Sequence, residues 1–119
     1  MFRVGNMKFE KTELGAQVTF MGDACIIQIE PETAAKIERW LRAWAGNKYV
    51  RYEWVVGDTT TLLPGRNGAL ILASASSEVR FEHYQGDRAG VSFASILDVP
   101  QIIAFMVRVQ KAHSTTFEI

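Results

Sequence analysis

Cysteine and histidine are scarce in this sequence. Its 119 residues include one cysteine, Cys25, and two histidines, His83 and His113. A single cysteine excludes an internal disulfide bond, and these three residues are not spaced as the ligands of a structural zinc site. We therefore expect no metal and no cofactor, and any metal ligands would have to be carboxylates.

The sequence also lacks an excess of charge of either sign. Thirteen basic residues balance thirteen acidic ones, with eight of each up to residue 60 and five of each after it. Proteins that bind duplex DNA or RNA usually carry a positive excess, because neutralising phosphates supplies most of their affinity. The balance argues against tight electrostatic binding of nucleic acid and leaves room only for a local patch.

Long apolar runs are missing as well. The N-terminal stretch "MFRVGNMKFEKTELG" has no apolar core of a signal peptide, and no run approaches the 18 residues that a bilayer requires. We expect no membrane contact and a cytoplasmic location. A composition of 48% apolar and 22% charged residues is typical of a folded domain, so we predict one domain over residues 1–119.

The pattern of apolar residues predicts an α+β fold. "GAQVTFMGDACIIQIE" alternates like a β-hairpin, and "EPETAAKIERWLRAWAGN" has the apolar spacing of a helix that begins near Pro31 and ends at Gly46. Short strands with turn signals follow to residue 96, and residues 98–112 form a second helix. We predict an antiparallel, curved sheet of six to seven strands with two α-helices packed on one face.

Two segments resemble each other. "IIQIEPETAAKIERWLRAW" and "FASILDVPQIIAFMVRVQKA" each pass from a strand through an acidic residue and a proline into an amphipathic helix. This similarity indicates two halves, each a sheet followed by a helix, although capping alone favours such a composition. The predicted topology resembles that of the single-strand nucleic-acid-binding folds of the transcriptional-coactivator and Whirly kind. The sequence contains none of their motifs, so the resemblance is one of topology.

The second helix has an unusually wide apolar arc. Ile102, Met106 and Val109 face one way, while Ile103 and Val107 face another, and one sheet face does not cover so wide an arc. Either the first helix lies beside it, or a second subunit does. For the second case, a homodimer, the predicted interface residues are Trp40, Phe105 and Val109.

Alternation along the strands also predicts an outer sheet face with aromatic and arginine side chains. Its candidate binding residues are Tyr49, Arg51, Arg80 and Tyr84, with Arg66 and Arg88 in turns where an anion could be contacted. The reversed order of these rows would pair residues 49–53 with residues 80–84 if their strands were neighbours. Small residues are expected to form a shallow floor between the two rows: Ala69, Ala73, Ala75, Ser92 and Ala94.

The sequence offers little for catalysis. Glu82 and His83 are adjacent on a strand, so their side chains point to opposite faces, and Cys25 is expected to be a buried thiol. We expect no enzyme activity. The predicted function is a binding or regulatory module that acts through a protein–protein interface, with another protein or a second copy of itself as partner. The alternatives are a weak single-stranded nucleic-acid-binding protein and a small-ligand pocket between helices and sheet.

Overall fold

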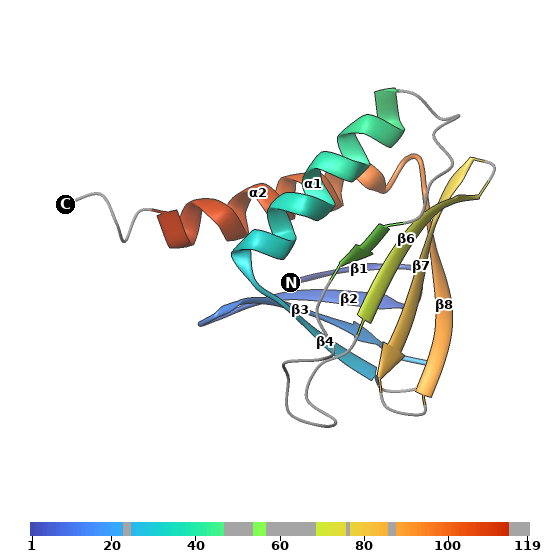
Figure 1. Cartoon of the computed structure of the whole chain (residues 1–119), viewed down its shortest axis with the longest axis horizontal. Helices are drawn as coiled ribbons and strands as arrows, with labels where there is room; N and C mark the ends of the chain where they lie inside the picture. The colour runs from blue at the N-terminus through green and yellow to red at the C-terminus, as the bar shows by residue number, and fades with distance from the viewer. Residues whose placement is uncertain (23–24, 47–53, 57–68, 76, 86–87, 115–119) are drawn as a thin grey trace.

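The fold consists of two successive units that share one order of elements, as the computed structural model shows (Figure 1). It describes residues 1–22, 25–46, 54–56, 69–75, 77–85 and 88–114. Each unit is a four-stranded antiparallel meander followed by a 16-residue helix. The first contains β1 (Phe2–Val4), β2 (Met7–Thr12), β3 (Gly15–Phe20), β4 (Cys25–Ile29) and α1 (Pro31–Gly46). The second contains β5 (Trp54–Val56), β6 (Ala69–Ala75), β7 (Glu78–Gln85), β8 (Arg88–Ser95) and α2 (Val99–Ser114).

The α+β class, the antiparallel pairing and the two helices are confirmed, whereas the prediction of one sheet with six to seven strands is wrong. The strands form two separate sheets, which we call sheet 1 (β1 to β4) and sheet 2 (β5 to β8). Within the described residues, β4 has no pairing with β5. Because α1 leaves directly from the end of β4 and extends about 24 Å, it carries the chain away from the edge of sheet 1 before β5 begins.

The first two strands were missed in the sequence analysis. Residues 7–10, "MKFE", alternate, with Met7 and Phe9 buried and Lys8 and Glu10 on the opposite face, and the exposed Lys11 ends this pattern. Phe9 lies opposite Val18, which lies opposite Ile27, so the three side chains form one row on the core side of sheet 1. The frequent charges of this segment conceal a regular half-buried strand.

Sheet 2 confirms part of the predicted alternation. Val79, Phe81 and His83 point into the core, as expected. Ser92 and Ala94, expected on the outer face, are buried as well, because Ser92 pairs with Phe81 and Ala94 with Val79. Residues paired across a ladder share one face, so Val91 and Phe93 lie on the outer face instead.

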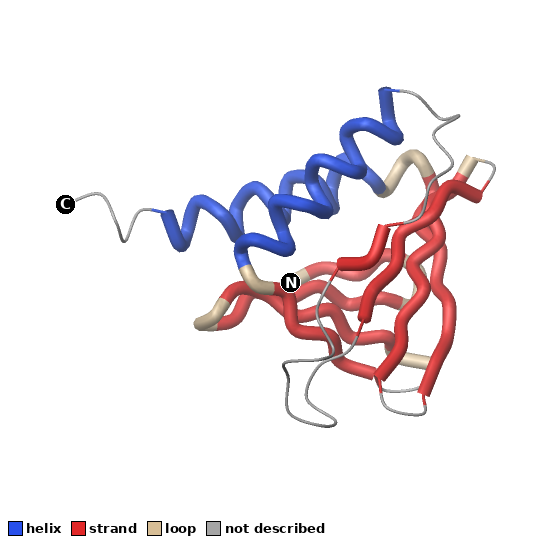
Figure 2. Tube along the Cα trace, viewed as in Figure 1, coloured by secondary structure: helices blue, strands red, loops and turns tan. Residues whose placement is uncertain are grey.

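The two helices pack against each other and form a layer next to both sheets (Figure 2). Phe105 of α2 meets the rings of Phe2 and Phe9 edge-to-face, with centroids 5.3 and 5.8 Å away. Trp44 of α1 donates a hydrogen bond from Nε1 to Oγ of Ser74 on β6, at 3.0 Å. Sheet 1 and α1 together therefore cover most of the wide apolar arc of α2.

The ends of the helices follow from local sequence. Pro31 opens α1, and the amide of Ala34 donates to the carbonyl of Glu30 at 2.8 Å. Asp98 precedes α2, where its carbonyl accepts the amides of Gln101 and Ile102, and its carboxylate accepts the hydroxyl of Ser95 at 3.1 Å. Proline is tolerated in a first helical turn, where no amide hydrogen is needed. In the described part of the chain, neither helix has the length and apolar character that crossing a membrane requires.

Gly15, the first residue of β3, is required by close packing. A Cβ there would overlap the carbonyl oxygen of Ile29, and its φ of +154° is unfavourable for other residues. We expect Gly15→Ala to lower the free energy of unfolding by about 1–3 kcal/mol, as measured by urea denaturation. The control is Gly46→Ala at the end of α1, where a Cβ meets nothing within 4 Å. That change should be neutral or stabilising by up to about 1 kcal/mol. Equal destabilisation by both variants would contradict this account.

Candidate functional site

The structure places two of the predicted binding residues together. Arg80 and Tyr84 lie on the outer face of β7, with Glu82 between them. Arg88 begins β8 opposite Gln85, and the position of its side chain lies outside the described part. Tyr49, Arg51 and Arg66 also lie outside the described residues. Residues 49–53, whose pairing with residues 80–84 was predicted, lie outside the described residues, and β7 pairs with β6 and β8.

Glu82 organises this outer face. Its carboxylate lies 2.7 Å from Nε of Arg80 and accepts a hydrogen bond from the Tyr84 hydroxyl at 2.9 Å. The three side chains follow one strand at alternate positions, so the pleat places them in a row. The local charges of Arg80 and Glu82 cancel, which limits the electrostatic attraction of this row for an anion.

The sequence analysis missed the two side chains that complete the surface. Val91 and Phe93 on β8 are 48% and 43% exposed, and Tyr84 is 41% exposed. In the β7–β8 ladder Val91 lies opposite Glu82, and Phe93 lies opposite Arg80. We call Tyr84, Val91 and Phe93 the sheet 2 patch. Gln85 pairs with Arg88, three positions further along the chain, and so close a pairing fixes the register of β7 and β8. This register is the signal from which the outer position of Val91 and Phe93 could have been predicted.

The outer face of sheet 1 has a different character. Gln28 donates to Gln17 at 3.4 Å, Gln17 donates to Glu10 at 3.2 Å, and Lys8 lies 3.7 Å from the same carboxylate. These polar groups satisfy one another across three strands. Ile26, 39% exposed, is a large apolar side chain on this face, so sheet 1 offers a polar surface and sheet 2 an apolar and aromatic one.

The three predicted interface residues are covered within a single chain. Trp40 and Phe105 are each 1% exposed, and Val109 is 0% exposed. Phe105 contacts the strands of sheet 1, where Phe2 and Phe9 stack on each other at 4.9 Å. A partner would reach these side chains only after the packing of α2 had opened.

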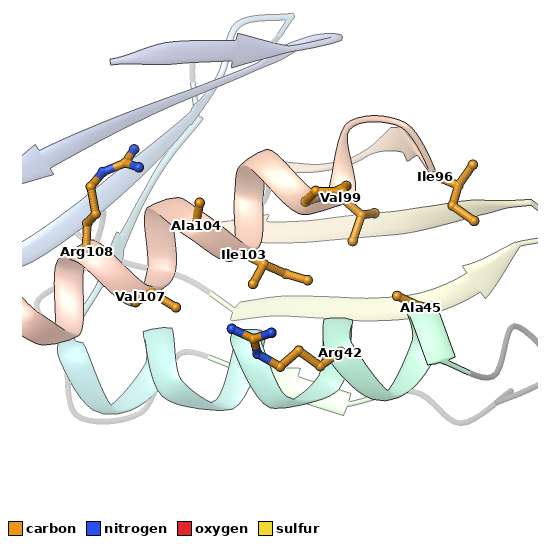
Figure 3. Close-up of a pocket in the computed structure, with 9 residues that line it drawn as sticks. Arg42, Ala45, Ile96, Val99, Ile103, Ala104, Val107 and Arg108 are labelled. Carbon is orange, nitrogen blue, oxygen red and sulfur yellow. The ribbon is translucent and has the colours of Figure 1, made fainter.

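A groove does remain between α1 and α2, on the side of the helices shown in Figure 3. Its volume is about 740 Å³. Apolar side chains of α2 and of the preceding turn form much of its lining, and two arginines, one from each helix, join them: Ile96, Val99, Ile103, Val107, Arg42 and Arg108. Ile103 and Val107 are half-buried at this surface. The arc of α2 is therefore wider than the described part of the chain covers, and the uncovered side chains differ from the interface residues that the sequence analysis predicted.

A polar cluster joins the two helices beside the groove. Glu38 of α1 lies 2.7 Å from Nε of Arg42 and accepts a hydrogen bond from Gln110 of α2, also at 2.7 Å. Gln110 donates in addition to the carbonyl of Met106 at 3.0 Å. The hydrogen bonds from Gln110 and Arg42 stabilise the carboxylate and hold the pKa of Glu38 below its ordinary value of 4.5.

Two of the groups considered for catalysis, His83 and Cys25, lie inside the fold, whereas Glu82 lies on the outer face of sheet 2. His83 is buried and stacks on Phe20 of β3, with ring centroids 3.9 Å apart. Cys25 is buried and is not part of a disulfide bond. In the ranges that the structure describes, no group of three or more histidine, cysteine, aspartate or glutamate side chains is arranged to hold a metal ion. The candidate functional sites among the described residues are therefore two surface features, the sheet 2 patch and the helix groove.

The lowered pKa of Glu38 predicts a dependence of stability on pH. A carboxylate whose pKa is depressed by folding stabilises the native state above its unfolded pKa, and this contribution is lost as the pH falls through the folded value. We expect Glu38→Gln to be less stable than the wild type at pH 7 by about 1 kcal/mol. The difference should shrink below about pH 4.5. Urea denaturation from pH 7 to pH 3 measures it, with Glu13→Gln in an exposed turn as control. A difference that is constant with pH would refute the assignment.

The burial of Phe105 predicts that a charge there disrupts the fold. Phe105→Glu should unfold the protein, because an unpaired buried carboxylate costs several kcal/mol against a total stability of about 5–15 kcal/mol. Gln101→Glu adds the same charge at an exposed position of α2 and should remain folded. Circular dichroism and sedimentation check both variants. A dimeric wild type whose Phe105→Glu variant is a folded monomer would instead support the homodimer interface expected from the sequence.

Comparison with known proteins assigns no relative: no family model, no curated protein and no solved structure matches the chain significantly.

Proposed function

We propose that the protein binds single-stranded nucleic acid on the outer face of sheet 2. The observation that carries this proposal is the sheet 2 patch, in which Tyr84, Val91 and Phe93 are each more than 40% exposed beside Arg80. Exposed aromatic rings on a sheet are stacking platforms for unpaired bases, and they accept any sequence because every base has a π-face. The function is therefore binding without sequence readout.

The arrangement of the patch supports an extended strand. Phe93 and Val91 are two residues apart on β8, so their side chains are about 7 Å apart along the strand. Tyr84 lies diagonally across the ladder from Val91, on the neighbouring strand. An unpaired chain of nucleotides that crosses β8 toward β7 would meet these side chains in turn. Duplex DNA presents its bases only at groove edges and does not fit such a face.

Charge limits the affinity. Arg80 is the one basic side chain described in the row on β7, and Glu82 lies against it at 2.7 Å. Few released counterions accompany such a contact, so binding should be weak and only mildly dependent on salt. The balanced charge of the whole chain is consistent with this.

A second function, binding of a protein partner through the helices, is supported by a different observation. The groove between α1 and α2 presents apolar side chains that no element of the described chain covers. The two surfaces lie on different elements, so the two functions do not compete.

The patch can be tested by fluorescence anisotropy with labelled 20-nucleotide dT and U strands. Phe93→Ala and Tyr84→Ala should each weaken binding about fivefold or more, because base stacking contributes about 1–3 kcal/mol per base. Glu82→Gln should strengthen it, because the amide keeps an acceptor for Tyr84 and removes a charge that repels phosphate.

The control is Ile26→Ala, which removes an apolar side chain of similar exposure from sheet 1 and should leave affinity unchanged. The slope of log Kd against log salt concentration should stay below about 2. The proposal fails if neither strand binds the wild type at a protein concentration on the order of 100 μM, which is high enough to detect weak binding. It also fails if Ile26→Ala has the same effect as Phe93→Ala.

A further inference from the structure

We propose that the groove between α1 and α2 binds an acidic amphipathic helix of a partner protein. This inference does not depend on the sheet 2 patch. It assigns the proposed protein-binding function to the helix groove and names an acidic helix as the ligand. It begins from α2, which has two apolar stripes. The inner stripe is buried in the core, and it includes Ile102, Met106 and Val109. The outer stripe, Ile103 and Val107, lines the groove.

The shape of the groove fits a helix. Ile103 and Val107 are one turn apart on α2, and Figure 3 shows their side chains on the side of α2 that faces α1. Ala45 of α1 and Ala104 of α2 are exposed and also line the groove, and their small side chains allow a close approach. Two neighbouring helices with such side chains form a trough, and an amphipathic helix can lay its apolar face in it.

The charge of the lining selects the partner. The charged side chains among the described residues that line the groove are Arg42 and Arg108, and no acidic residue is among them. The carboxylate of Glu38 pairs with Nε of Arg42 and neutralises part of the charge of that arginine. The guanidinium of Arg108 lies 5.9 Å from the ring of Phe105. Figure 3 shows Arg42 pointing from α1 toward α2 and Arg108 pointing away from α1, so a partner helix needs carboxylates on both flanks of its apolar stripe to pair with both arginines.

The same charges disfavour a second copy of this chain. A two-fold interface places the same patch of both subunits face to face. Arg42 and Arg108 of each copy would then enter one interface with no carboxylate from the lining to pair with them. Nucleic acid is disfavoured too, because none of the described residues that line the groove is an aromatic residue on which a base could stack.

The test uses a fluorescein-labelled, 18-residue helical peptide with leucines at positions i, i+3, i+4 and i+7 and glutamates on its flanks. An otherwise identical peptide with lysine for glutamate is the control ligand. The acidic peptide should bind the wild type with a Kd in the micromolar range, and the lysine peptide at least tenfold more weakly. Arg108→Glu and Ala104→Glu should each weaken binding of the acidic peptide about tenfold, because the first reverses a charge and the second fills the trough and repels carboxylates.

Lys36→Glu, an equal charge reversal at an exposed position of α1 outside the groove lining, is the matched control and should leave binding unchanged. Circular dichroism checks that each variant is folded. Arg108→Glu should bind single-stranded dT with the affinity of the wild type, which separates this surface from the sheet 2 patch. The proposal is overturned if the acidic peptide does not bind, or if both peptides bind equally. It is also overturned if sedimentation shows a micromolar dimer that Ala104→Arg dissociates, because a second copy would then occupy the groove.

Discussion

The packing of α1 against α2 is the interaction on which the remaining structure depends. The two sheets have no strand pairing with each other in the described part of the chain, so the shared helix layer is the main element that connects them. Trp44 connects this layer to sheet 2 through Ser74, and Phe105 connects it to sheet 1 through Phe2 and Phe9. The two sheets also contact each other directly, where the ring of Phe20 on β3 stacks on that of His83 on β7.

This arrangement leaves each sheet with one free face, and the two free faces differ in chemistry. On sheet 1 the glutamine and glutamate side chains hydrogen-bond to one another, so their polar groups are already satisfied. On sheet 2 the patch keeps aromatic and apolar surface in contact with water. Isolated exposed apolar residues are common on proteins, but a contiguous group of them on one sheet face is typical of a binding surface.

The helix layer is likewise two-sided. Its inner side is the centre of the core, where Trp40 and Val109 are covered completely. Its outer side has a groove whose described lining combines apolar side chains with Arg42 and Arg108. A helix that contributes to the core and also lines a surface groove needs an apolar arc wider than that of an ordinary surface helix, and this explains the composition of α2.

The sequence by itself determined the local structure: the two helices, the starts at Pro31 and Asp98, the repeated order of sheet and helix, and the inward face of β7. These depend on periodicity and capping, which act over a few residues. Only the tertiary structure decided that the strands form two sheets, that Phe105 lies against β1 and β2, and that Val91 and Phe93 are exposed. Each of these depends on which segments become neighbours in space, and the partner of a strand edge or helix face is not encoded in the pattern of that segment alone.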